Sequence, residues 1–381
     1  MPGNPPRNAR IDFLRGIAIS SVLILHFALS YGLKDSPLGS LLGTELLKAI
    51  AYNGNFGVTI FFVISGFLIT STSLARWGSL DKLDARSFYL YRFARIMPSL
   101  ILALSIIVIL GSLGLPSFNN TDSGGQPLPA SYFLVGAGSV LTFWHNLLMQ
   151  SAGYFNYCLN IYWSLSVEEV FYLLLPLACL TLRRSWMIVA LCLAAVALGP
   201  LYRSWHTDNE IFFMYAYQAC FDAIAIGCLA ALLAPRLSAS FLIRYARPLR
   251  IVAGVCLGAV YLRGINGHEV FGFTLIALAS AGFLLASSGQ QRGGWSTGRL
   301  SHGLRWMGRH SYEIYLFHII VLGLMRNVLS KQQLSYATRL PWLLLFLVLS
   351  ALAAALVSRY VSEPANRAIR RSRPAKWQLA G

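Results

Sequence analysis

The chain has 381 residues, of which 56% are hydrophobic and only 12% are charged, and its mean hydropathy is +0.59. This composition excludes an ordinary soluble protein, because soluble domains carry about 25% charged residues. The net charge of +17 favours anionic lipid headgroups nearby over nucleic acid, since no basic run is interleaved with aromatic residues in a soluble module. We therefore predict an all-α, polytopic membrane helix bundle.

Ten apolar segments are each about long enough to cross ~30 Å of hydrocarbon as a helix. In chain order they are 11–32, 54–75, 96–115, 160–182, 186–203, 211–234, 249–264, 269–287, 311–329 and 340–361. A further apolar stretch, 131–149, follows the polar, turn-rich loop 116–130, which we expect on the outer side. We predict that 131–149 is re-entrant or interfacial, with its backbone polar groups buried in protein.

Basic residues predict the orientation of these segments, because Lys and Arg collect on the cytoplasmic side of a bilayer. With the N terminus inside, 24 of the 31 Lys and Arg residues fall in cytoplasmic segments. A full crossing by 131–149 would instead place Arg183 and Arg184 outside. We expect residues 1–381 to form one membrane domain with cytoplasmic tails at 1–10 and 365–381 and no appended soluble domain.

The first apolar segment carries a polar stripe, and ionisable groups inside membrane spans are expensive enough to be functional candidates. Arg15 and His26 are eleven residues apart, and Asp12 lies three residues before Arg15. Eleven residues rotate a helix by ~1100°, three turns plus ~20°, so these side chains share one face. A histidine among carboxylates and arginines can act as a general base near neutral pH. A structural Asp12–Arg15 pair that fixes the helix end explains two of these residues equally well.

Arginines and glutamates recur in later segments. Arg92 and Arg95 stand at the start of the third segment, where two guanidinium groups can hold the phosphates of a soluble donor. They also fit simple positive-inside anchors. The adjacent Glu168 and Glu169, with Ser166 beside them, lie in an apolar segment and are harder to explain structurally.

The remaining ionisable and sulfur-containing residues are weaker candidates. His318, near the outer end of its segment, fits an interfacial hydrogen bond better than a catalytic role. Asp222 and Glu313 also lie in apolar segments. The six cysteines have no CxxC spacing and mostly lie within segments, so we expect neither a disulfide framework nor a metal site.

Six motifs in chain order resemble those of the acyltransferase 3 family of integral membrane acyltransferases. In IDFLRGIAISSVLILHF, Arg15 and His26 keep the family's spacing of ten residues between an arginine and a histidine. NFGVTIFFVISGFLIT is similar to its second helix, and YRFARIMP keeps its two arginines as Arg92 and Arg95. YWSLSVEEVFYLLLP is similar to its WSLxxExxFYLxxP segment. GRHSYEIYLFH and VSEPANR resemble the last two motifs, although no proline follows the histidine in FHIIV.

The resemblance implies ten helices and transfer of an acyl group from a cytoplasmic acyl-CoA, usually acetyl-coenzyme A, to a hydroxyl. The acceptor would be a cell-surface glycan, a lipid-linked saccharide or, as an alternative, a small secondary metabolite such as a macrolide. Arg15, Arg92 and Arg95 match the family's donor-binding arginines, and His26 matches its catalytic histidine. Arg15 and His26 stand ~16 Å apart along a helix, about the reach of a pantetheine arm. The bacterial inner membrane is the expected location.

The family resemblance also suggests roles for the other polar residues. We expect His26 either to deprotonate the acceptor hydroxyl or to carry the acyl group itself. Asp12 is expected to orient the polar stripe, and Glu168, at the family's acidic position, to assist the acceptor or pair with an arginine. Weaker substrate-binding candidates are Glu169, Ser166 and His318.

A polytopic transporter or flippase for a saccharide or lipid is the alternative from another class. Intramembrane Asp, Glu, His and Arg also mark proton-coupled transport. The lack of an internal repeat and the series of motifs favour the enzyme. A receptor or scaffold without chemistry would leave the stripe of Arg15 and His26 unexplained.

Overall fold

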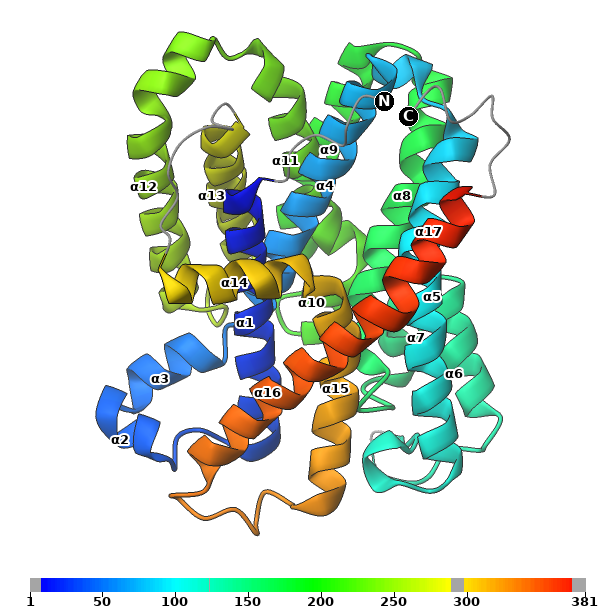
Figure 1. The fold of residues 1–381 in the computed structure, drawn as a ribbon, viewed down its shortest axis with the longest axis vertical. Coiled ribbons are helices and arrows are strands. Elements are labelled where there is room, and N and C mark those ends of the chain that lie inside the picture. Colours follow the sequence, from blue (N-terminus) through cyan, green and yellow to red (C-terminus); the bar gives the residue numbers. More distant parts are fainter. Residues whose placement is uncertain (1–7, 123, 289–297, 372–381) are drawn as a thin grey trace.

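The computed structural model describes residues 8–122, 124–288 and 298–371. These residues form helices joined by loops, with two isolated β-bridges and no strand among them (Figure 1). The prediction of an all-α helix bundle is confirmed. Residues 1–7 and 372–381, which make up most of the two predicted tails, lie outside the described residues.

The helices follow one another in this order. The α-helices are α1 (Ala9–Tyr31), α2 (Pro37–Leu42), α3 (Thr44–Ala51), α4 (Asn55–Trp77), α5 (Ala85–Ser112), α6 (Tyr132–Leu141), α7 (His145–Ala152), α8 (Trp163–Leu182), α9 (Ser185–Ser204), α10 (Glu210–Tyr215), α11 (Tyr217–Leu233), α12 (Ala239–Arg263), α13 (Gly272–Ser288), α14 (Arg299–Arg309), α15 (Ser311–Val328), α16 (Arg339–Val357) and α17 (Glu363–Arg371). Four short 3-10 turns and one π turn complete the described chain: η1 (Leu80–Lys82), η2 (Pro116–Phe118), η3 (Asn160–Tyr162), η4 (Ala234–Arg236) and η5 (Ser358–Ser362).

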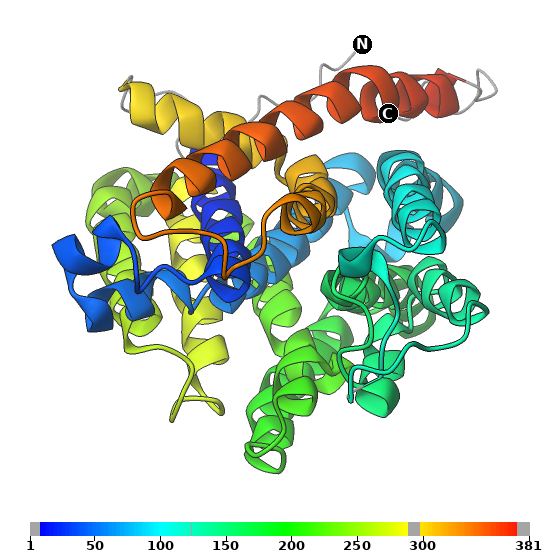
Figure 2. The ribbon, with the colours of Figure 1, turned by 90° about the horizontal axis from the view of Figure 1, so that it is seen from below.

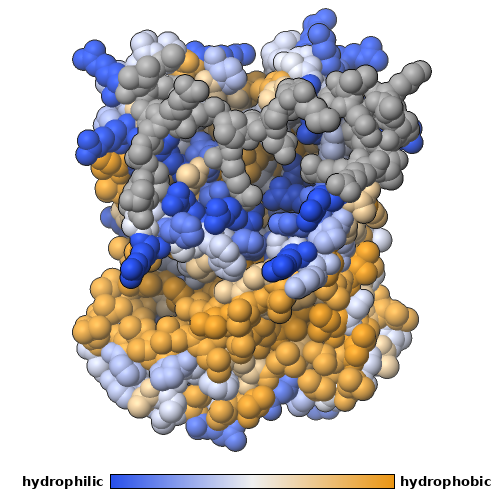
Figure 3. Space-filling view, in the orientation of Figure 1, coloured by the Kyte–Doolittle hydropathy of each residue, from blue (hydrophilic) through white to orange (hydrophobic). Residues whose placement is uncertain are grey.

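Eight helical stretches of the described chain are long and apolar enough to cross a membrane. They are Ala9–Tyr31, Thr44–Trp77, Ala85–Ser112, Asn160–Leu182, Ser185–Ser204, Glu210–Arg236, Arg244–Arg263 and Arg339–Ile369. The predicted segments 269–287 and 311–329 form the shorter helices α13 and α15, of 17 and 18 residues. Leu344, Val348 and Leu352 of α16 are exposed, and a broad band of hydrophobic side chains crosses the lower half of the face in Figure 3, above a hydrophilic lower edge. Such a surface fits contact with lipid, and the protein is an integral membrane protein.

α1 lies inside the bundle, while α14 and the continuous α16 and α17 cover one side of it (Figure 2). Two glycines bring α1 and α14 into backbone contact. A Cβ atom at Gly16 would lie 2.0 Å from the Leu304 carbonyl oxygen, and one at Gly308 would lie 1.8 Å from the Asp12 carbonyl oxygen. Only glycine permits so close an approach, and it fixes the position of the polar stripe on α1.

The apolar stretch 131–149 forms two short helices instead of one span. α6 has ten residues and α7 has eight, and the chain turns between them at Phe143, whose φ is 64°. Ten residues rise only about 15 Å, half the hydrocarbon thickness. The structure therefore agrees with the prediction that this stretch does not cross the membrane.

Cysteine labelling from the two sides of the membrane tests this topology. In a Cys256→Ser background, where the other native cysteines are buried, we expect Gln126→Cys and Tyr154→Cys to react with an impermeant maleimide from outside. Arg184→Cys should react only after the membrane has been permeabilised, so that the reagent reaches the cytoplasmic side. All three positions are exposed, so a missing signal is not explained by burial. Labelling of Tyr154→Cys from the cytoplasmic side alone would contradict the assignment of 131–149.

The third predicted segment, 96–115, begins too late. α5 starts earlier because the Asp84 carboxylate caps its first turn, accepting hydrogen bonds from two backbone N–H groups. Arg92 and Arg95 therefore lie inside the helix and not at its start. The two arginines are consequently held by regular helical geometry.

Two other predicted segments have different internal structure. The segment 211–234 is interrupted at Ala216, whose extended backbone separates α10 from α11. The segment 340–361 contains a π turn, η5, after which the chain continues as α17. Residues 365–371, predicted as part of the C-terminal tail, are thus helical.

Candidate active site

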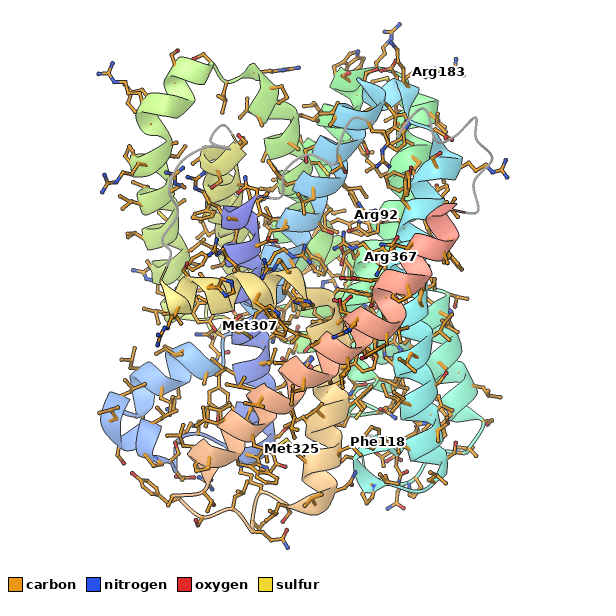
Figure 4. The ribbon with its side chains drawn as sticks, in the orientation of Figure 1. Arg92, Phe118, Arg183, Met307, Met325 and Arg367 are labelled. Carbon is orange, nitrogen blue, oxygen red and sulfur yellow. The ribbon has the colours of Figure 1, made fainter. Side chains whose placement is uncertain are left out.

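Helices α1, α4, α5, α8 and α15 enclose a cavity of about 100 Å³. Its charged lining residues are Arg15, Arg92, Arg95, Glu168 and Glu169. Three separate helices supply them, so the fold brings together five residues that the sequence singled out. Figure 4 shows Arg92 in the upper half of the molecule, toward the end where Arg183 lies.

The arginines of this cavity are differently held. Arg15 is buried, and its Nε and Nη2 atoms donate hydrogen bonds of 3.1 and 2.8 Å to the Ser311 hydroxyl of α15. The Arg92 guanidinium lies over the Tyr172 ring, 4.5 Å from its centroid. Within the described chain, neither Arg92 nor Arg95 forms an ion pair with a carboxylate. The cavity therefore offers guanidinium groups that can bind a phosphate group, beside the carboxyl groups of Glu168 and Glu169.

The two glutamates face the same cavity but have different partners. The Glu168 carboxylate accepts hydrogen bonds from the hydroxyls of Ser65 on α4 and Tyr172 one turn further along α8. Glu169 is buried, and its Oε1 atom has no hydrogen-bond partner among the described residues. A buried oxygen without a partner is costly, so it favours a ligand that brings an N–H or O–H donor.

His26 and His318 form a pair across α1 and α15. The His318 Nε2 atom lies 3.1 Å from His26 Nδ1, and the ring centroids are 5.0 Å apart. His318 Nδ1 lies 3.0 and 2.7 Å from the carbonyl oxygens of Ile314 and Tyr315. Carbonyl oxygens only accept hydrogen bonds, so we assign the proton of His318 to Nδ1.

That assignment determines the state of His26. With its proton on Nδ1, neutral His318 can only accept through Nε2, so the hydrogen bond between the rings is donated by His26 Nδ1–H. The other ring nitrogen of neutral His26, Nε2, then keeps its lone pair. His318 is fully buried whereas His26 is partly exposed. In this arrangement Nε2 of His26 has the lone pair that a base or nucleophile needs, and the contact with His318 orients the His26 ring.

The histidine pair lies beside the cavity and not in its lining. Tyr315, which lines the cavity, has its ring centroid 5.8 Å from that of His318. Its hydroxyl donates to the Ile161 carbonyl oxygen at 2.7 Å and shares a 2.6 Å hydrogen bond with Ser164. Tyr315 therefore stands between the arginine-lined cavity and the histidines.

Two predicted site residues lie elsewhere. Asp12 is buried where α1 meets α14 and does not line the cavity. Ser166 is on the opposite side of α8, where its hydroxyl accepts a 3.1 Å hydrogen bond from the backbone N–H of His145. Ser166 thereby supports α7, the second half of the non-crossing stretch.

Several polar contacts of the site were not predicted from the sequence. They involve Ser65, Ser164, Tyr172, Ser311 and Tyr315. Tyr172 had a usable signal, because it follows Glu168 by four residues and so lies on the same helix face. The others depend on contacts between helices that no local pattern encodes. Among the described residues, no group of three or more His, Cys, Asp or Glu side chains could hold a metal ion.

Residues 8–359 match the acyltransferase domain that defines the acyltransferase 3 family. The chain belongs to this family. It is 27% identical over 341 residues to the peptidoglycan O-acetyltransferase OatA of Listeria monocytogenes. The match covers 85% of this chain and 50% of that protein. It is 22% identical over 376 residues to the O-acetyltransferase OatA of Staphylococcus aureus. This match covers 94% of this chain and 57% of that protein.

The chain spans about half the length of the curated relatives it matches. No solved structure matches it. The family that the sequence motifs predicted is confirmed, because the acyltransferase domain covers nearly the whole chain.

Proposed function

We propose that this protein is an O-acetyltransferase that moves an acetyl group from cytoplasmic acetyl-CoA to a hydroxyl of a cell-surface glycan or lipid-linked saccharide. The observation that carries the proposal is the arrangement along α1. Arg15 faces the arginine-lined cavity, and His26 pairs with His318 about 16 Å further along the helix. The names of the relatives support O-acetylation and a glycan of the bacterial cell envelope.

The donor would bind with its phosphates at Arg92 and Arg95 and its pantetheine arm in the cavity. Arg15, held by Ser311, would complete the positive lining. The unpartnered Oε1 atom of Glu169 is suited to accept a hydrogen bond from an amide N–H of that arm. The thioester would then pass Tyr315 and reach His26 in the membrane interior.

Transfer by the general-base route uses the free lone pair of His26. Nε2 removes the proton of the acceptor hydroxyl while the oxygen attacks the thioester carbonyl carbon. The C–S bond breaks, and the leaving thiolate takes the proton back from His26. His318 stabilises the transient imidazolium by accepting its Nδ1–H. In the acyl-histidine route the same lone pair attacks the thioester first, so the assigned tautomer serves both routes.

Donor binding tests the first half of this proposal. If Arg92 and Arg95 hold phosphates by charge-assisted hydrogen bonds worth ~1.5–3 kcal/mol each, Arg92→Ala and Arg95→Ala should each weaken acetyl-CoA binding roughly ten- to a hundredfold. Lysine should rescue only in part, because it lacks the planar fork of the guanidinium. Titration calorimetry on purified protein measures the affinity.

Arg184→Ala is the matched control for these variants, since Arg184 is an exposed cation that does not line the cavity. It should bind acetyl-CoA like the wild type. Unchanged affinity in both Arg92→Ala and Arg95→Ala would leave these residues as membrane anchors and would remove the cavity from the donor site.

A further inference from the structure

Two of the cations near the outer end of α1, Arg326 and Lys331, form no ion pair with another described residue. In the predicted topology seven of the 31 basic residues lie outside the cytoplasmic segments, namely Lys34, Lys48, Arg203, Arg263, Arg326, Lys331 and Arg339. Three of these form ion pairs, Lys48 with Glu45, Arg203 with Asp222 and Arg339 with Asp35. In the part of the chain that the structure describes, Arg326 and Lys331 form none. Positive charge on this side opposes the usual bias and calls for a specific role.

The surroundings of Arg326 connect it to the histidine pair. Its guanidinium lies 4.1 Å from the centroid of the Tyr157 ring. The Tyr157 hydroxyl shares a 2.5 Å hydrogen bond with Ser30, which follows His26 by one helical turn on the same face, about 6 Å further out. Lys331 also lies near this end of α1, with Cε 3.5 Å from the position of a Cβ atom built on Gly32.

We call Ser30, Tyr157, Arg326 and Lys331 the outer basic cluster. Figure 4 places Met325, the neighbour of Arg326 in the sequence, at the end of the molecule opposite to Arg183. Phe118, from the loop expected outside, lies near Met325 in that view. The cluster and the arginine-lined cavity therefore lie on opposite sides of the histidine pair along α1.

The chemistry of the outer basic cluster fits an anion carried on a sugar. A guanidinium that lies over a ring face can still donate N–H hydrogen bonds to a carboxylate or phosphate. Ser30, Tyr157 and Arg326 are half-buried, so contacts there are less screened than on an open surface. The two hydroxyls can exchange hydrogen bonds with sugar hydroxyls. An uncharged acceptor would make no use of the two cations.

We propose that the outer basic cluster binds an anionic group of the acceptor saccharide and thereby directs the acceptor hydroxyl to Nε2 of His26. This inference rests on the proposed function, because it assumes that an acceptor reaches His26 from the side opposite to the donor. It names the acceptor class more narrowly, as a saccharide with a carboxylate or phosphate close to the acylated hydroxyl.

A binding measurement tests the cluster without relying on turnover. The probes are an oligosaccharide that contains N-acetylmuramate and the same oligosaccharide with its carboxylate converted to the methyl amide. Binding is measured to His26→Ala protein in phosphatidylcholine nanodiscs, without donor. When Arg326→Met is added to this variant, binding of the acidic probe should weaken roughly ten- to a hundredfold, which is the loss expected of a charge-assisted contact. Binding of the amide probe should not change. Arg326→Lys should lose less than Arg326→Met.

Arg263→Met is the matched control, since Arg263 is an exposed outer cation at the end of α12. It should bind both probes like its parent. Equal affinities of the Arg326→Met protein and its parent for the acidic probe would overturn the inference. The inference would also be overturned if Arg326→Met weakened the binding of added phosphatidylglycerol and left binding of the acidic probe unchanged. The cluster would then be a site for a lipid headgroup. Failure of the proposed function would give a different result. The wild-type protein would transfer no acetyl group, while binding of the acidic probe would still depend on Arg326.

Discussion

Changing His26 to alanine is expected to reduce acetyl transfer about 10²- to 10⁴-fold, the usual loss for a positioned base. The reason is that His26 Nε2 is the one lone pair that the histidine pair leaves available for the reaction. Acetyl-CoA affinity should stay near that of the wild type, because His26 does not line the arginine-lined cavity. Initial rates of transfer and donor titrations on the same purified samples give both quantities.

Two further substitutions separate chemistry from packing. His26→Asn keeps an N–H group near the place of Nδ1, so it can still bond to His318, but it has no counterpart of Nε2, and we expect it to be as inactive as His26→Ala. His318→Gln offers an acceptor oxygen to His26 Nδ1–H and should retain more activity than His318→Leu. Substantial transfer by well-folded His26→Asn protein would end the catalytic assignment of this residue.

The second large effect concerns stability. Arg203 and Asp222 form a fully buried ion pair, with 2.7 Å between Nη2 and Oδ2, that joins α9 to α11. Thr274 of α13 accepts a 2.6 Å hydrogen bond from the same guanidinium. Gly199 makes room for the carboxylate, because a Cβ there would lie 2.5 Å from its carbon atom. Asp222→Ala would leave the guanidinium buried without a counter-charge, at a cost of about 3–5 kcal/mol.

We therefore expect a clear fall in the melting temperature of detergent-purified Asp222→Ala protein, measured by intrinsic fluorescence. The double variant Arg203→Met with Asp222→Leu removes both charges and should recover much of the loss. Lys48→Ala serves as the control, because its partner Glu45 is exposed and such pairs contribute about 0–1 kcal/mol. A wild-type melting temperature for Asp222→Ala would show that this ion pair does not hold the three helices together.

Local periodicity predicted part of this site correctly. Arg15 and His26 share a face of α1 because eleven residues make three turns plus only ~20°, which is a property of any helix. On α8, Glu168 faces the cavity while Ser166, two residues earlier, is about 200° away and faces α7. The same helical rotation would have removed Ser166 from the list of substrate-binding candidates.

Other features depend on packing between distant segments. The contact of His26 with His318 joins residues 292 positions apart and exists only because α1 and α15 pack together. The early start of α5 also escaped prediction, because a hydropathy window registers the apolar part of a helix and misses the polar turns that Asp84 caps. Their charge and the motif resemblance both indicated Arg92 and Arg95 as donor candidates, but only the fold places them with Arg15 around one cavity.

The most direct test follows a labelled acetyl group. Purified wild-type protein in liposomes receives acetyl-CoA labelled in its acetyl group on the cytoplasmic side and an N-acetylmuramate oligosaccharide on the other. We predict that the label appears on the saccharide as a base-labile ester, in equal amount to the free coenzyme A thiol released. Movement of unmodified saccharide across the membrane, with the label still on coenzyme A, would contradict the account and favour a transporter.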